Sequence, residues 1–245
     1  MAQPNHKVML VTGGSRGIGA ATALLAARQG YAVAVNFTAN SLAADEVVRQ
    51  IRAQGGTAIT VKADVAQEAE VLAMFEKVDA KLGTLSALVN NAGVVDVAQR
   101  LDEMSFARLQ RMFNINVLGS FLCAREAVRR MSTRHGGSGG SIVNVSSAAS
   151  RLGAPGQYVD YAAAKGAIDT MTLGLAKEVA AEGIRVNAVR PGLIETDIHA
   201  SGGLPDRVRD LAHMVPMQRG GSAEEVAEVI VWLLSPAASY TTMSL

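Results

Sequence analysis

Tyr161 is the one tyrosine of the chain with a lysine four residues later, in the segment Tyr161-Ala-Ala-Ala-Lys165. On a helix this spacing puts a phenol and an ammonium one turn apart on the same face. The pKa of a free tyrosine is about 10, which is too high for a base at neutral pH, and a neighbouring ammonium lowers it by favouring the phenolate. Such a pair can exchange a proton with a substrate oxygen. Chance also places this pair on many helices, so the interpretation depends on its surroundings.

Hydroxyl groups follow an apolar run just upstream. The segment Ser141-Ile-Val-Asn-Val-Ser-Ser147 predicts a buried strand with serines at its end. A serine at that position can hold a substrate carbonyl by hydrogen bonding. The residues alone do not choose among Ser146, Ser147 and Ser150.

A glycine-rich turn, TGGSRGIG at residues 12–19, follows the first predicted strand directly and opens a helix. Glycines there turn the chain tightly, let the backbone approach a pyrophosphate and let helix pack closely on strand. The helix N-terminus then offers N–H groups to phosphates. The alternative is that these glycines serve only the close packing of the helix on the strand. The spacing is GxxxGxG, and no GxxxxGK[ST] occurs, so we expect a dinucleotide site rather than a phosphate-transfer loop.

The end of the second predicted strand bears on which dinucleotide binds. An acid about 20 residues after the turn would bond the ribose 2′-hydroxyl of NAD(H). The segment 35–40 contains no acid, and the first one that follows is Asp45. Arg16, within the turn, can instead pair with a 2′-phosphate. We therefore predict a preference for NADP(H), with NAD(H) possible.

The elements that position these residues alternate along the whole chain. Short Val/Ile/Leu-rich runs are typical of strands buried on both faces, and longer Ala-rich stretches have helical spacing. The predicted strands are Val8–Val11, Ala32–Phe37, Ala58–Lys62, Leu85–Asn90, Ser141–Val145 and Ile184–Ala188. The predicted helices are 18–29, 41–54, 67–82, 103–132, 159–182 and 222–234. This order predicts an α/β fold with one doubly wound parallel sheet of Rossmann type, forming a single domain over residues 1–245.

Residues 196–217 interrupt the alternation. They contain glycines and prolines around a polar helical stretch, Asp206–Met214. Because ligands of doubly wound folds bind beyond the carboxyl ends of the strands, we expect this segment to form a lid over the substrate. A plain surface loop is the alternative.

Composition excludes several classes of function. The formal charge is +1, from 23 basic and 22 acidic residues, so nothing suggests a nucleic-acid partner. Cys123 is the sole cysteine, and the N-terminal stretch Met1–Lys7 is polar, without the apolar core of a signal peptide. No apolar run has the length to span a membrane, and the histidines, His6 among them, are too scattered to predict a metal site. We expect a cytoplasmic protein.

Taken together, the motifs resemble those of the short-chain dehydrogenase/reductase family. The set is TGGSRGIG at 12–19, Asp64-Val65, NNAG at 90–93, Asn116, Ser146-Ser147, YAAAK at 161–165 and Pro191-Gly192. It covers residues 7–235. Within the family the chain is most similar to bacterial sugar-dehydrogenase-like and 3-oxoacyl-carrier-protein-reductase-like members.

The resemblance implies NAD(P)(H)-dependent hydride transfer between a carbonyl and a secondary alcohol. It implies that Tyr161 transfers the proton, Ser147 polarises the substrate, Lys165 tunes Tyr161 and bonds the nicotinamide ribose, and Asn116 holds a water next to Lys165. Tyr161 and Lys165 thus also count among the residues that contact the cofactor. The other implied contacts with the cofactor are Gly13, Ser15, Arg16, Gly17, Ile18, Gly19, Asn36, Asp64, Val65, Asn90, Ala92, Gly93, Pro191, Gly192, Ile194 and Thr196.

Other aspects stay open at this point. By resemblance, helices 103–132 and 159–182 pair across a twofold axis, giving a homodimer or homotetramer. A segment like 238–242 usually leads into a last apolar strand, which the residues up to Leu245 do not clearly predict. A dinucleotide-binding regulator would keep the glycine turn without needing Tyr161, Lys165, Ser147 and Asn116, and a methyltransferase would want an acid after the second strand. The small-molecule substrate is not specified.

Overall fold

The computed structural model describes residues 7–245, apart from the side chain of His199, so His6 and the polar stretch before Lys7 lie outside it. Within this part of the chain, parallel strands form a six-stranded sheet in the order β3-β2-β1-β4-β5-β6. The strands are β1 (Val8–Val11), β2 (Ala32–Phe37), β3 (Ala58–Lys62), β4 (Leu85–Asn90), β5 (Gly140–Val145) and β6 (Ile184–Val189). Strands β1 to β3 are added toward one edge of the sheet and β4 to β6 toward the other, so the order of strands reverses between β1 and β4. Doubly wound folds bind their ligands at this point.

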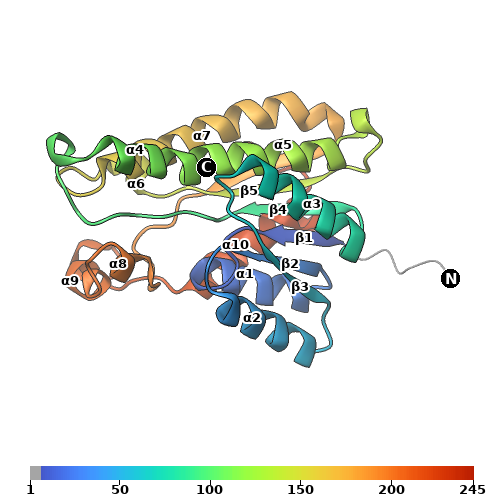
Figure 1. The fold of residues 1–245 in the computed structure, drawn as a ribbon, viewed down its shortest axis with the longest axis horizontal. Coiled ribbons are helices and arrows are strands. Elements are labelled where there is room, and N and C mark those ends of the chain that lie inside the picture. The colour runs from blue at the N-terminus through green and yellow to red at the C-terminus, as the bar shows by residue number, and fades with distance from the viewer. Residues whose placement is uncertain (1–6) are drawn as a thin grey trace.

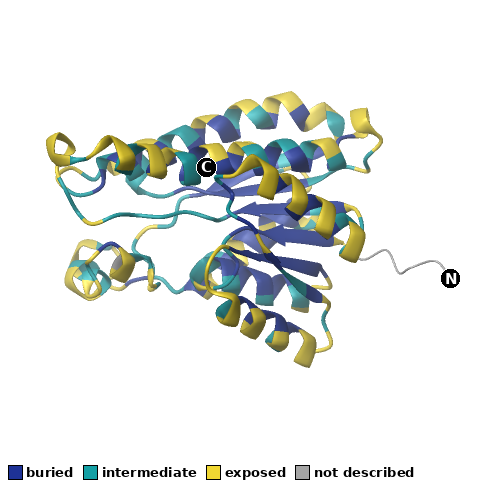
Figure 2. Ribbon diagram, viewed as in Figure 1, coloured by how far each residue is buried: buried dark blue, intermediate teal, exposed yellow. Residues whose placement is uncertain are grey.

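Helices cover both faces of this sheet (Figure 1). One layer contains α1 (Gly17–Arg28), α2 (Ser41–Ala53) and α10 (Ala223–Leu234), and the other contains α3 (Glu68–Leu82), α5 (Gly119–Met131) and α7 (Val159–Val179). Strand residues alternate between the two cores: Met9 and Val11 pack toward α1, while Val8 and Leu10 pack toward α3 and α5. Because both faces are covered, β1, β2, β4, β5 and β6 are buried along most of their length, whereas the edge strand β3 is partly exposed (Figure 2). The predicted doubly wound fold is confirmed.

One predicted helix differs from the structure in an informative way. The single helix expected over 103–132 starts only at α4 (Phe106–Phe113), where the Ser105 hydroxyl caps it by accepting the Arg108 N–H. The run then widens into a π-helical turn at Asn114–Leu118 before α5 begins. The Asn116 side chain donates to the Met112 carbonyl one turn back, which competes with regular α-helical bonding.

The C-terminal residues add to the sheet without forming a regular strand. The Met243 N–H donates to the Val186 carbonyl at 2.7 Å, and the Ala188 N–H donates to the Ser244 carbonyl at 2.8 Å. These residues thus take the place beside β6 where the sequence left a seventh strand open. Within residues 7–245, no helix has both the length and the hydropathy that crossing a bilayer requires.

The segment expected to be a lid forms two short helices, α8 (Ile198–Ser201) and α9 (Arg207–Leu211), beyond the strand ends (Figure 1). Only the second was predicted. Its two ends meet, because the Gly221 N–H donates to the Leu193 carbonyl and the Gly221 carbonyl accepts the Glu195 N–H, each at 2.9 Å. The segment is thus a compact loop whose two ends lie side by side.

Candidate active site

Helix α7 presents Tyr161 and Lys165 on one face, one turn apart. The Lys165 ammonium lies 5.6 Å from the centre of the Tyr161 ring and donates a 2.7 Å hydrogen bond to the Val145 carbonyl at the end of β5. Lys165 is 4% exposed, so its charge sits almost wholly inside the protein. The two residues and the carboxyl edge of the sheet therefore form one site.

Burial determines the ionisation of this lysine. It lowers the pKa of Lys165 from 10.5 to about 8, and the negative charge of Asp169 opposes that fall. At neutral pH the ammonium form therefore still predominates. A cation held this close to a phenol favours the phenolate form.

Of the serines left open by the sequence, Ser147 is the one bonded to Tyr161. Burial raises the pKa of Tyr161, and the hydrogen bond with the Ser147 side chain acts against that rise. Ser146 points elsewhere, since its hydroxyl donates to the Lys165 carbonyl at 3.2 Å. A substrate oxygen placed between the Ser147 and Tyr161 hydroxyls would meet two donors at once.

Asn116 is fully buried in the π-helical turn, and its amide is committed to the chain itself. It accepts the Val94 N–H at 3.1 Å and donates to the Val94 and Met112 carbonyls at 3.0 Å each. Gly93 runs past this amide so closely that a Cβ there would lie 2.7 Å from Asn116 Oδ1 and 3.5 Å from Lys165 Nζ. A π-helical turn next to a reactive group is a frequent feature of functional sites.

The glycine turn has the backbone that a pyrophosphate cradle needs. Gly13 and Gly17 have φ angles of 59° and 53°, which disfavour any other residue. A Cβ on Gly19 would lie 2.4 Å from the Gly13 carbonyl oxygen. No side chain caps the start of α1, where Arg16 is the N-cap residue, so its first N–H groups face outward. The turn thus fits a phosphate-containing cofactor.

Asn91, which the motif contained but the site prediction did not include, holds this turn in place. Its amide donates to the carbonyls of Thr12 and Gly13 at 2.9 and 3.0 Å, and the Thr12 hydroxyl accepts the N–H groups of Asn91 and Ala92. The end of β4 is thereby locked to the end of β1. The spacing of residues within the NNAG motif could not predict a contact with a segment almost 80 residues away.

Asn36 lies under the turn rather than in the cleft. It is 1% exposed, accepts the Gly13 N–H at 3.1 Å and donates to the carbonyls of Val61 and Ala63. Arg16, by contrast, is exposed, and no ion pair to it occurs among the described residues. Beside it in the turn, Ser15 and Ile18 are partly exposed.

The remaining residues on the predicted adenosine side have internal contacts. The Asp64 carboxylate accepts the Ala66 N–H at 2.9 Å, and Val65 is buried where a Cβ on Gly119 would lie 2.7 Å from it. Asn90 is also buried, and its amide donates to the Asn144 side chain of β5 at 3.0 Å.

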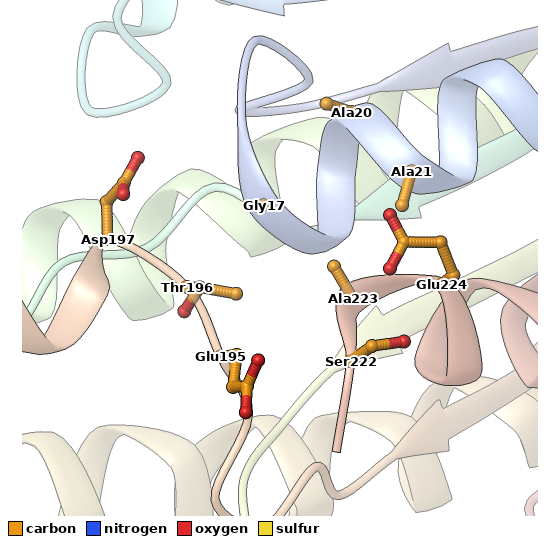
Figure 3. Close-up of a pocket in the computed structure, with 9 residues that line it drawn as sticks. All are labelled: Gly17, Ala20, Ala21, Glu195, Thr196, Asp197, Ser222, Ala223 and Glu224. Carbon is orange, nitrogen blue, oxygen red and sulfur yellow. The ribbon is translucent and has the colours of Figure 1, made fainter. Parts of the chain in front are cut away.

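A pocket of about 340 Å³ lies where the glycine turn meets the loop after β6, and Figure 3 shows the residues that line it. Thr196 forms one wall and reaches Gly17, since a Cβ there would lie 3.2 Å from the Thr196 methyl group. Three carboxylates, Glu195, Asp197 and Glu224, also line it. The residues that lead into this loop, Pro191, Gly192 and Ile194, are partly or fully exposed.

Two buried ion pairs around α7 were not predicted. Arg108 binds Asp160, directly before Tyr161, with side chains 8% and 0% exposed, and Arg190 binds Asp169. Arg108 also donates to the Val97 carbonyl at 2.6 Å, so it joins α4, the loop after β4 and α7. The partners lie far apart in the sequence, which is why spacing did not reveal them.

Comparisons with known proteins agree with this geometry. The family model described as enoyl-(acyl carrier protein) reductase matches residues 13–245. The uncharacterized oxidoreductase YgfF of Escherichia coli K12 is 59% identical over 97% of this chain and 96% of its own length. The 3-oxoacyl-[acyl-carrier-protein] reductase of a Synechocystis strain is 40% identical over 96% of this chain and 92% of its own.

Among solved structures, a short-chain dehydrogenase of Burkholderia cenocepacia in complex with NADP has a TM-score of 0.89 and 32% identity, covering 97% of this chain and 94% of that one. The fold and the site define an oxidoreductase built on a dinucleotide-binding sheet. The chain belongs to the short-chain dehydrogenase/reductase family and is an NAD(P)-dependent enzyme of that family. The predicted resemblance is confirmed.

Proposed function

We propose that this enzyme interconverts a carbonyl compound and a secondary alcohol with NADP(H), and that Tyr161 carries the proton. The observation behind this proposal is the cluster formed by the Tyr161 phenol, the Ser147 hydroxyl bonded to it and the Lys165 ammonium one turn away. A binding protein would have no need of a cation buried beside a phenol. The glycine turn would hold NADP(H), which would supply or accept the hydride.

The side chains of the site have separate roles in the proton transfer. In the direction of reduction, Tyr161 donates a proton to the substrate oxygen while Ser147 donates a hydrogen bond to the same oxygen as negative charge develops there. The Lys165 ammonium stabilises the phenolate that Tyr161 leaves behind. In the direction of oxidation, the same phenolate removes the proton from the alcohol. The bond from Lys165 to Val145 keeps the ammonium in place throughout.

Replacing the phenol tests this assignment. We expect Tyr161→Phe to lower kcat by about 10²–10⁴-fold, the usual worth of general acid–base catalysis, with little change in the Kd for NADPH. Tyr240→Phe is the matched control, because Tyr240 lies fully exposed at 104% relative exposure. Turnover is first sought with a panel of sugars, acyl thioesters, ketones and steroids, followed at the nicotinamide absorbance. A Tyr161→Phe enzyme with near-normal kcat would refute the assignment.

We also propose that NADP(H) is preferred over NAD(H). The exposed guanidinium of Arg16 in the turn and the lack of an acid after β2 support this, as does the NADP complex of the Burkholderia relative. Charge-assisted hydrogen bonds contribute about 1.5–3 kcal/mol, so Arg16→Ala should weaken NADPH binding roughly 10–100-fold and leave NADH binding unchanged. Equal losses for both cofactors, or a wild-type preference for NADH, would contradict the proposal.

Residues 196–217 are proposed as the lid of this one functional unit. Two contacts support it: Arg207 donates to Gln157 Oε1 at 2.6 Å, and Tyr158 donates to the Gly202 carbonyl at 3.3 Å. Arg207→Ala should raise the KM for substrate without changing the Kd for NADPH, since it loosens only the lid. Arg209→Ala, an exposed neighbour, is the control. An unchanged KM would identify the segment as a plain loop.

A homodimer or homotetramer through the helices at 103–132 and 159–182, which are α4, α5 and α7 in the structure, completes the proposal. Large apolar side chains are exposed along the run from α4 to α5, namely Phe106, Phe113, Leu118 and Phe121. Light scattering should give a mass of at least two chains at micromolar concentration, and Phe121→Glu should reduce it. A wild-type monomer would contradict this.

A further inference from the structure

A second charged group lies beneath the proposed site, one turn beyond Lys165 on α7. The Asp169 carboxylate accepts hydrogen bonds from Arg190 Nε at 3.0 Å and Arg190 Nη2 at 2.9 Å, both to Oδ2. The two side chains are only 11% and 19% exposed. Burying an ion pair is often no more stabilising than an apolar pair of the same size, so stability alone does not account for it.

The position of this pair relates it to three segments of the site. Asp169 shares α7 with Tyr161 and Lys165, and Arg190 directly precedes Pro191 in the loop after β6. Ser146 and Ser150, before and after Ser147, also lower the pKa of this carboxyl group. The Ser146 hydroxyl itself donates to the Lys165 carbonyl on α7, while Ser150 Oγ and Asp169 Oδ1 are buried without a hydrogen-bond partner among the described residues. Three separate segments thus converge on one carboxylate.

The carboxylate stays ionised in this environment. Burial alone would raise the pKa of Asp169, but the Ser146, Arg190 and Ser150 side chains outweigh that effect and hold the pKa below its ordinary value. Its negative charge then acts on Lys165 and opposes the loss of the lysine proton.

Among the described residues, Asp169 is the anion whose charge acts on Lys165. On α7 the ammonium faces Tyr161, β5 contributes only the Val145 carbonyl, and the residues at Gly93 and Asn116 are uncharged. The remaining charge nearby is the positive one of Arg190, from the end of β6, which is paired with Asp169.

We propose that Asp169, held by Arg190, is a positioning residue for the reaction: it places a fixed negative charge next to Lys165 and ties the Ser147 and Pro191 segments to α7. The proposal builds on the proposed function, in which the Lys165 cation supports the Tyr161 phenolate. Asp169 is proposed to act through Lys165 and not by contact with the reacting atoms.

A first experiment measures Lys165 directly and needs no activity. The chain has few lysines, Lys7, Lys62, Lys77, Lys81, Lys165 and Lys177, so their ¹³Cε signals can be followed by NMR, with Lys165→Met identifying the signal of interest. We expect Asp169→Asn to lower the pKa of Lys165 below the wild-type value. Arg190→Gln should raise it, because Asp169 is then unneutralised. Glu178→Gln, an exposed carboxylate on the same helix, should leave it unchanged. An unaltered Lys165 in both Asp169→Asn and Arg190→Gln would overturn the inference.

A second experiment connects the pair to catalysis. In Asp169→Asn, the acid limb of the pH profile for alcohol oxidation should move to higher pH. Lys165 is then protonated in a smaller fraction of the molecules, so it stabilises the Tyr161 phenolate less and the phenol ionises only at higher pH. Asp169→Glu should restore the wild-type profile in part. A purely structural role would lower kcat equally at every pH, and that result would overturn the proposal. Wild-type inactivity on the whole panel would instead count against the proposed function, while the NMR titration would still decide the effect of Asp169.

Discussion

We expect Lys165 to destabilise the folded protein at neutral pH, so the free energy of unfolding should depend on pH. The residue is buried, and its pKa is lowered from an ordinary 10.5 to about 8. Below pH 8 the lysine is protonated in both the folded and the unfolded chain, so the folded state bears the full penalty of burying a cation. As the pH rises from 8 to 10.5 the folded chain releases its proton first, and stability increases. Lys165→Met removes this effect.

The size of the effect follows from the two pKa values. Each pKa unit corresponds to about 1.4 kcal/mol, so the penalty is about 3 kcal/mol at pH 7 and less than 1 kcal/mol at pH 10. The stability of Lys165→Met relative to wild type should therefore fall by about 2–3 kcal/mol between these two pH values. The lost bond to the Val145 carbonyl is a separate cost of about 1–3 kcal/mol at both pH values, so it changes the absolute difference without affecting its pH dependence.

The measurement is urea unfolding of apo wild type and Lys165→Met at pH 7 and pH 10. Lys177→Met is the matched control, since Lys177 lies on the same helix but is exposed. Its stability relative to wild type should be the same at both pH values. If the difference for Lys165→Met also stays constant within about 0.5 kcal/mol, roughly the error of the linear extrapolation, then Lys165 is not a destabilising buried cation and the reasoning fails.

Three further results are expected. Gly19→Ala should weaken NADPH binding at least 10-fold, because the new Cβ would lie 2.4 Å from a carbonyl oxygen across the turn, whereas Ala20→Gly should leave calorimetric titrations unchanged. Cys123 is buried, and burial followed by a nearby carboxylate raises its pKa to about 12, so a thiol reagent should react at pH 8 only after unfolding; rapid native labelling would contradict this. Arg108→Ala leaves the Asp160 carboxylate buried without its partner and should cost about 3–5 kcal/mol in urea unfolding, a loss under 1 kcal/mol being incompatible with that geometry.

The strands were predictable because burial on both faces leaves a continuous apolar run. β1 to β4 have the predicted bounds, while β5 begins one residue earlier, at Gly140, and β6 ends one later, at Val189. The π-helical turn was not predictable from periodicity, because it depends on where the Asn116 amide finds its partners. The pairing of the C-terminal residues with β6 depends likewise on backbone bonds, not on an apolar run.

For the site, the sequence indicated residue types but not their surroundings. Tyr161 and Lys165 lie on one face of α7 as their spacing predicts, since helix geometry alone determines it. Asn36 was predicted to contact the cofactor, and the structure places it beneath the turn as a hydrogen-bond partner of Gly13. Asp169 gave no signal at all, because its partner is in another segment.

Helix α7 explains how the site combines these demands. At successive turns it buries Asp160, Lys165, Asp169 and Thr172, which bind in order α4, the end of β5, the residue after β6 and again β5. Apolar side chains alone would let such a helix slide or rotate slightly, whereas each of these polar groups is satisfied in only one register. Burying these polar groups therefore costs desolvation free energy, but their bonds hold α7 in one register. That register fixes the position of Tyr161 on the helix. A stabilising substitution at Lys165 should accordingly be an inactivating one, because the burial that destabilises the fold also removes the water that would screen the ammonium from the Tyr161 phenol.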